Sequence, residues 1–163
     1  SIDTLNYKGH LWPEFRNEQR KIVQSVPYTG MAVTSDIGFR NDVHPTNKKV
    51  VGERIALLAL SKTYFQNIAH SGPEPVAAYF KNNKITISFK HTGGLLQTSD
   101  TSILCGVSLD GRNPISATIN KYNIVINTNK KSEFVYYGWQ PYSIGNLINK
   151  SLLPTSTFKI SVK

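Results

Sequence analysis

The chain has 163 residues, 39% of them hydrophobic, which is enough for one ordinary domain or for two small ones that share an interface. Its formal charge is +9, but the basic residues are scattered and form no arm of the kind that binds nucleic acid. A single cysteine excludes an internal disulfide and a multi-thiolate metal site, and no apolar stretch reaches the roughly 18 residues that span a bilayer. We therefore expect a globular protein whose partners include neither nucleic acid nor a membrane.

The first part of the chain predicts two helices around one buried strand. Apolar residues recur near helical spacing over residues 12–26, and Pro13 stands where a first helical turn tolerates it. Residues 31–34 form a short apolar run suited to a buried strand, and a second helical pattern covers residues 47–64. The apolar positions of the two patterns are Trp12, Phe15, Ile22, Val23 and Val26, and then Val50, Val51, Ile55, Leu58 and Ala59. This order of elements is typical of an α/β layer with parallel strands.

The character of the chain changes after the proline-rich stretch at residues 71–75, which we take as a domain boundary. Strand candidates then follow one another at short intervals, separated by turn residues such as Asn82 and Asn83. They cover residues 76–80, 84–90, 103–109, 117–119, 123–126 and 133–138. The sequence therefore predicts an α+β protein, with an α/β piece in residues 1–72 and an antiparallel β-sandwich in residues 73–163.

A short motif that could take part in catalysis lies in the loop between the predicted strand and the second helix. Asp42 precedes His44 by two positions, and side chains two apart in an extended segment point the same way. The carboxylate could therefore orient the imidazole, and a histidine held in this way can act as a general base for a serine nucleophile. A loop histidine beside a helix-capping residue is the simpler interpretation of the motif alone.

The longer segment around this motif resembles a known family. It reads GMAVTSDIG at residues 30–38, NDVHP at residues 41–45, NK at residues 47–48 and VGERIA at residues 51–56. In spacing, loop motif and following helix it closely resembles the last catalytic block of the sialate O-acetylesterases, a branch of the SGNH hydrolases. Near the C-terminus, YYGW at residues 136–139, NLIN at residues 146–149 and LPTSTF at residues 153–158 are similar to that family's closing segment.

The resemblance implies an SGNH-type α/β domain in which His44 is the catalytic histidine. The wider SGNH pattern places an aspartate three positions before the histidine, where this chain has Asn41, whereas Asp42 lies two positions before it. We favour Asp42 as the orienting group, and a backbone carbonyl in that role stays open. Asp36 is an outside candidate whose alternative interpretation is an Asx turn at the start of the loop.

The resemblance also implies that part of the active site lies elsewhere. The family's serine nucleophile stands in an N-terminal segment similar to Gly-Gln-Ser-Asn, and this chain has no such segment. We therefore expect the chain to be the C-terminal part of a carbohydrate esterase, which supplies the histidine but not the serine and is inactive alone. Its expected partners are the N-terminal remainder of the enzyme and an O-acetylated sugar, either sialic acid or a plant polysaccharide. No cofactor or metal is needed, and the parent is expected to be periplasmic or extracellular.

Two other functions stay open at this stage. The chain could be a non-catalytic carbohydrate-binding or structural β-sandwich module, with the His44 region a relic of the domain boundary. It could also bind nucleic acid through its net charge, although no recognition motif supports this. Tyr136, Tyr137 and Trp139 either stack on a sugar ring or pack in the core.

Overall fold

The structure, a computed structural model, describes residues 9–40, 42, 44 and 46–163. A short 3-10 helix, η1 (Gly9–Leu11), leads into the helix α1 (Trp12–Ser25), and the helix α2 (Lys48–Lys62) follows. Pro13 lies in the first turn of α1, where its missing N–H group costs no helical hydrogen bond. Asn47 caps α2, because its side chain accepts a hydrogen bond from the N–H group of Val50. Both helices lie where the sequence predicts them.

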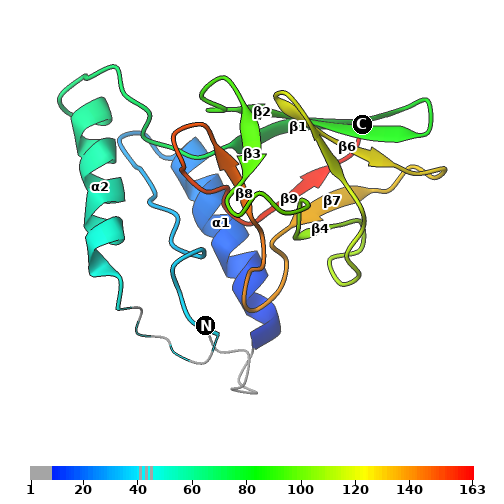
Figure 1. Ribbon diagram of the computed structural model, residues 1–163, viewed down its shortest axis with the longest axis horizontal. Helices are drawn as coiled ribbons and strands as arrows, with labels where there is room; N and C mark the ends of the chain where they lie inside the picture. The colour runs from blue at the N-terminus through cyan, green and yellow to red at the C-terminus, as the bar shows by residue number, and fades with distance from the viewer. Residues whose placement is uncertain (1–8, 41, 43, 45) are drawn as a thin grey trace.

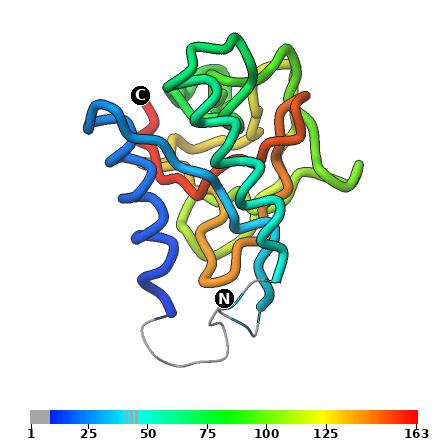
Figure 2. The backbone as a smooth tube through the Cα atoms, turned by 90° about the vertical axis from the view of Figure 1, so that its left-hand side faces the viewer, coloured from blue at the N-terminus to red at the C-terminus, as the bar shows by residue number. Residues whose placement is uncertain are grey.

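The buried strand predicted at residues 31–34 is wrong. This segment has an irregular backbone and only intermediate burial, and it runs between α1 and α2 (Figures 1 and 2). A strand needs a neighbour that pairs with its N–H and C=O groups. Within the described part of the chain, the segment instead accepts hydrogen bonds at two carbonyls, from the Arg54 side chain to Val33 and from the N–H group of Ile37 to Thr34.

The fully described stretch 46–163 forms nine strands, all paired antiparallel within three small sheets. They are β1 (Glu74–Lys81), β2 (Lys84–Lys90), β3 (Leu96–Thr98), β4 (Val107–Ser108), β5 (Thr118–Asn120), β6 (Asn123–Asn127), β7 (Phe134–Tyr137), β8 (Leu147–Asn149) and β9 (Phe158–Ser161). The sheets have the strand orders β1-β2-β6-β5, β3-β8 and β4-β7-β9. The α+β class and the antiparallel pairing are confirmed, and the two-sheet sandwich stays a prediction.

One predicted strand is much shorter than expected. Of residues 103–109, only Val107 and Ser108 form a strand, which is β4. The Asn146 side chain explains the difference, because it accepts the N–H group of Cys105 and donates to the carbonyl of Ile103. Backbone groups that are satisfied by a side chain do not need a neighbouring strand.

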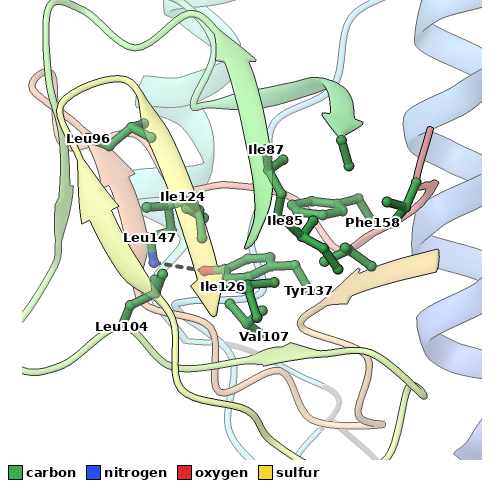
Figure 3. Close-up of a cluster of buried hydrophobic side chains, with 13 residues drawn as sticks. Ile85, Ile87, Leu96, Leu104, Val107, Ile124, Ile126, Tyr137, Leu147 and Phe158 are labelled. Carbon is green, nitrogen blue, oxygen red and sulfur yellow. Dashed lines mark hydrogen bonds between the residues drawn. The ribbon is translucent and has the colours of Figure 1, made fainter. Parts of the chain in front are cut away.

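The three sheets enclose one apolar core (Figure 3). Its fully buried members come from all three sheets and include Ile85, Ile87, Leu96, Ile124, Ile126, Val107, Val135, Tyr137, Leu147 and Phe158. The ring of Tyr137 stacks on that of Phe158, with 5.4 Å between centroids. Its hydroxyl accepts a hydrogen bond of 2.7 Å from the N–H group of Leu147, and burial raises the pKa of Tyr137 above its ordinary value.

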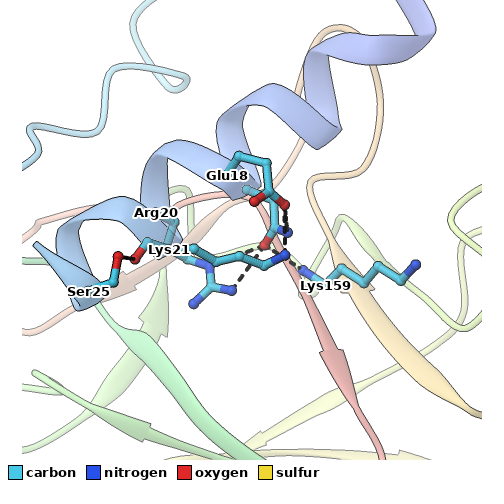
Figure 4. A network of polar contacts seen from close by, with 6 residues as sticks. Glu18, Arg20, Lys21, Ser25 and Lys159 are labelled. Atoms are coloured by element: carbon cyan, nitrogen blue, oxygen red, sulfur yellow. Dashed lines mark hydrogen bonds and ion pairs between the residues drawn. The ribbon is translucent and has the colours of Figure 1, made fainter.

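The face that α1 turns toward the sheets is largely polar (Figure 4), since two of its three buried residues are Asn17 and Arg20. Asn17 is 2% exposed, and its side-chain oxygen accepts the N–H group of Lys159 in β9 at 3.1 Å as well as the guanidinium of Arg20. The apolar positions of the helix lie elsewhere, since Phe15 is 54% exposed and Ile22 is 52% exposed. The pattern predicts the helix correctly, but the residues that face the sheets are polar.

Arg16 makes the second junction between α1 and the β region. Its guanidinium donates to the hydroxyl of Thr157 at 2.8 Å and to the carbonyls of Gly138, Gln140 and Pro141. Burial lowers the pKa of Arg16 to about 10, so the side chain stays charged at neutral pH. A planar guanidinium suits this position, because it presents several donors in fixed directions.

Arg16→Ala should lower the free energy of unfolding by about 3 kcal/mol, because it leaves several part-buried acceptors without their donor. The exposed Arg112 is the matched control, and Arg112→Ala should change the free energy by less than about 0.5 kcal/mol. Chemical denaturation of both variants measures the difference. Equal effects of the two substitutions would show that the Arg16 contacts do not hold α1 to the β region.

Candidate active site

Asp42 and His44 lie together in the loop before α2, and both are exposed to solvent. The His44 Nδ1 atom is 3.4 Å from Asp42 Oδ1, and the side chain of His44 is 87% exposed. The same carboxylate oxygen accepts a hydrogen bond of 2.8 Å from the N–H group of His44, which makes an Asx turn. The two side chains are thus close enough to interact, and their catalytic roles stay predictions.

The electrostatics of this turn favour an ionised carboxylate. The N–H group of His44 and, to a smaller degree, its imidazole lower the pKa of Asp42 below its usual range. Neighbouring Asn41, which stands where the wider SGNH pattern has an aspartate, lies outside the described residues, as do Val43 and Pro45.

Asp36 is held in an ion pair with α2. Both oxygens of its carboxylate accept hydrogen bonds from the guanidinium of Arg54, at 2.7 and 2.6 Å. Arg54 also donates to the carbonyl of Val33 at 2.6 Å, and its side chain is only 11% exposed. A bidentate pair fixes both distance and orientation. Arg54 therefore ties α2 to the segment that leads into the His44 loop.

Tyr142 contacts the same loop from the β region. Its hydroxyl donates to the carbonyl of Gly38 at 3.4 Å, and the guanidinium of Arg40 lies 5.4 Å from the centre of its ring. The sequence analysis assigned no role to Arg54 or Tyr142. Arg54 stands inside the VGERIA segment of the family resemblance, which is a signal that could have found it, and we see no such signal for Tyr142.

A cavity of about 400 Å³ lies beside the motif, between α1, residues 31–35 and residues 141–143. Asp42 contributes to its wall together with Trp12, Phe15 and Tyr142. Ligand sites are often concave, with an apolar wall and a few polar groups. The cavity therefore places an apolar surface beside the carboxylate of the candidate pair.

The aromatic residues near the end of β7 do not form an open platform. Tyr137 is 1% exposed and belongs to the core, whereas Tyr136 and Trp139 contact each other edge to face at 5.2 Å. Packing in the core is thus the correct interpretation for Tyr137.

The fold brings two histidines together that are far apart in the sequence. The rings of His70 and His91 are 5.5 Å apart, and His91 Nε2 is 3.9 Å from a carboxylate oxygen of Glu74. Glu74 also pairs with Lys90 at 3.0 Å. Within the described residues, no group of three or more His, Cys, Asp or Glu side chains is arranged to hold a metal ion. No described helix is long and apolar enough to cross a membrane.

Comparison with known proteins relates the chain to an esterase. No protein-family model and no curated protein matches it. Its structure is similar to the crystal structure of a novel carbohydrate acetylesterase from Xanthomonas citri, with 33% sequence identity and a TM-score of 0.83. The match covers 94% of this chain but only 38% of the X. citri protein. The chain therefore spans less than half of the length of the X. citri protein that it matches.

The hydrogen bond between His44 and Asp42 should be visible in a pH titration. Because the folded pKa of Asp42 is lowered, this contact is complete above the ordinary value of 3.8 and is lost as the pH falls through the lower folded value. The NMR shift of the His44 amide proton should therefore titrate with a midpoint below 3.8. This titration should vanish in Asp42→Asn, and a midpoint at or above 3.8 in the unmodified chain would contradict the observed turn.

Arg54→Ala should destabilise the chain by about 2 kcal/mol, because it leaves Asp36 and the Val33 carbonyl without their shared partner. Lys49→Ala is a matched control in the same helix, since Lys49 pairs with Glu53 at 3.8 Å and is 86% exposed. That change should cost less than about 0.5 kcal/mol. Thermal unfolding and hydrogen exchange of residues 36–44 measure both effects. Unchanged exchange in Arg54→Ala would mean that the ion pair does not hold the loop.

Proposed function

We propose that the chain is the C-terminal part of a carbohydrate esterase that removes O-acetyl groups from sugars by serine-type hydrolysis. The observation that carries this proposal is the likeness to the X. citri carbohydrate acetylesterase over 94% of the chain. The Asp42 and His44 pair supports it, because a loop histidine beside a carboxylate suits acyl transfer. In this proposal the chain supplies the base, and the remainder of the enzyme supplies the serine.

The proposed chemistry has two halves. His44 takes the proton of the serine hydroxyl while the serine oxygen attacks the acetyl carbonyl, and the imidazolium then returns the proton to the departing sugar hydroxyl. A water molecule next loses a proton to His44 and attacks the acetyl-serine, and the imidazolium returns this proton to the serine oxygen as acetate is released. Asp42 would stabilise the imidazolium, because its carboxylate is ionised at neutral pH and lies 3.4 Å from the ring nitrogen of His44.

The substrate would be an acetylated sugar such as sialic acid or a plant polysaccharide residue. The sialate specificity and the SGNH assignment rest on the sequence resemblance at residues 30–56 and remain part of the proposal. The division into an SGNH-type piece at residues 1–72 and a β-sandwich at residues 73–163 is also part of the proposal.

One observation favours the non-catalytic alternative. The Asp42 carboxylate accepts the N–H group of His44 in an ordinary Asx turn, and such a turn needs no catalytic purpose. In a carbohydrate-binding or structural module, the pair would bind no reacting group. The two functions are separated by turnover, since a binding module retains sugar without releasing acetate.

His44→Ala in the full-length parent should reduce acetate release by about four to six powers of ten, because loss of a triad member removes the proton transfer. Asp42→Asn should be milder, and nearly silent if a backbone carbonyl orients the ring. The isolated chain should release no acetate. The measurement uses acetylated sialic acid and acetylated xylan as substrates.

Lys49→Ala, in the exposed surface of α2, serves as the control and should keep the rate of the unmodified parent. An unchanged rate in His44→Ala, or turnover by the isolated chain, would overturn the proposal. Sugar binding by a parent that releases no acetate would favour the non-catalytic module.

A further inference from the structure

We propose that the outward face of the sheet β1-β2-β6-β5 binds a polysaccharide chain that carries carboxylate groups. We call this surface the outer sheet face. It is defined by the side chains of Tyr79, Lys81, Lys84, Thr86, Asn123 and Asn127. The surface is independent of the proposed catalytic role, because it uses neither His44 nor Asp42.

The alternation along β2 sets the direction of this face. Ile85 and Ile87 are fully buried in the core, so Lys84 and Thr86 point to the opposite side of the sheet. Residues that pair directly across neighbouring strands have their side chains on the same side. Because β1 and β6 lie on either side of β2, the register extends this outward face over three strands (Figure 1).

The face carries an exposed aromatic ring. Tyr79 in β1 pairs with Thr86 in β2, and Tyr79 is 52% exposed. The Lys163 Nζ atom lies 5.9 Å from the centre of this ring, and the N–H group of Lys163 donates to the carbonyl of Ala78 in β1. A tyrosine ring offers an apolar surface for the C–H groups of a sugar and a hydroxyl that can form a hydrogen bond at its edge.

Three lysines surround this ring without a carboxylate among them. Lys81 pairs with Lys84 across β1 and β2, and like charges directly opposite each other repel. Within the described part of the chain, Lys81, Lys84 and Lys163 form no ion pair with an acidic side chain. An anionic ligand would relieve the repulsion and supply the negative charge that the face itself lacks.

Polar side chains without internal partners complete the surface. Thr86, Asn123 and Asn127 make no side-chain hydrogen bond with another described residue. An amide and a hydroxyl can each donate and accept, as the hydroxyl groups of a sugar also do. An exposed ring, unused amides and lysines together suit a sugar chain with carboxylates.

The same composition argues against burial of this face under another folded domain. The cores of protein interfaces are depleted in charged residues, and lysine in particular is rare there. The outer sheet face instead has lysine and asparagine at positions where an interface would have apolar side chains. A hydrated polymer is the type of partner that fits this polarity.

The test is binding of the chain to polygalacturonate, a polymer of carboxylated sugars, followed by NMR. Methyl-esterified polygalacturonate is the matched ligand, because it keeps the sugar chain and loses the charges. The amide signals of Tyr79, Thr86 and Asn127 should shift on binding, and the esterified polymer should bind at least about tenfold more weakly. Added salt should weaken binding to the charged polymer. Equal binding of the two polymers, or no shift at these three residues, would overturn the proposal.

The lysines are tested by the double substitution Lys81→Gln and Lys84→Gln. It should raise the Kd for polygalacturonate by about tenfold or more, because it removes both paired cations. Both positions are exposed, so the melting temperature should not fall. Lys48→Gln with Lys49→Gln, at exposed positions of α2, is the matched control and should leave the Kd unchanged. Equal effects of the two double substitutions would show that only the overall charge matters and would overturn the proposal.

The ring is tested in the same way. Tyr79→Ala should raise the Kd by about tenfold, because the sugar loses its apolar contact. Tyr64→Ala is the control, since Tyr64 is 69% exposed and lies outside the sheet. A DNA oligonucleotide that binds the unmodified chain as tightly as polygalacturonate would identify a general polyanion surface, which would also overturn the proposal.

Measurements on the full-length parent separate this surface from the proposed function. The parent and its His44→Ala variant should both bind polygalacturonate with the affinity of the chain, and loss of binding in the parent would reject the surface. Binding without acetate release would keep the surface and reject the catalytic role. Acetate release that depends on His44, without binding of polygalacturonate, would keep the catalytic role and reject the surface.

Discussion

The polar junction between α1 and β9 is the constraint on which the arrangement of this chain depends. Asn17 accepts the N–H group of Lys159, and Arg16 donates to the carbonyls that follow β7. These bonds orient α1 with its polar side toward the sheets. The apolar residues of α1 must then face away from the main core, and Phe15 turns into the cavity beside Asp42. A helix held by apolar packing would instead have hidden this surface.

Contacts from α2 and from the β region position the candidate site. Arg54 holds Asp36 from α2, and Tyr142 contacts Gly38 from the β region. Beyond these anchors, His44 projects into solvent, and among the described residues the carboxylate of Asp42 lies close to its ring nitrogen. This combination suits a catalytic base whose substrate and nucleophile arrive from another part of an enzyme. The start of the loop is fixed at Asp36 and Gly38, whereas the imidazole of His44 is held loosely.

The sequence predicted best those features that depend on local physical chemistry. The turn between β1 and β2 lies at Asn82 and Asn83, as predicted, and both residues have the left-handed conformation that asparagine tolerates. The short strands β3, β8 and β9 were missed, because three or four residues show little alternation and depend on tertiary partners. The strand predicted at residues 31–34 was wrong for a related reason, since a strand requires a neighbour. The close approach of His44 and Asp42 follows from local spacing, but the Arg54 and Tyr142 contacts depend on the fold.

The distribution of buried and exposed groups links these observations. The β region completes its own core, as the buried pair of Tyr137 and Phe158 shows. The helical region does not, because α2 buries no residue and residues 31–34 have no strand partner among the described residues. Packing is thus complete around the β core, whereas apolar side chains of the two helices, such as Phe15 in α1 and Ile55 in α2, stay 54% exposed.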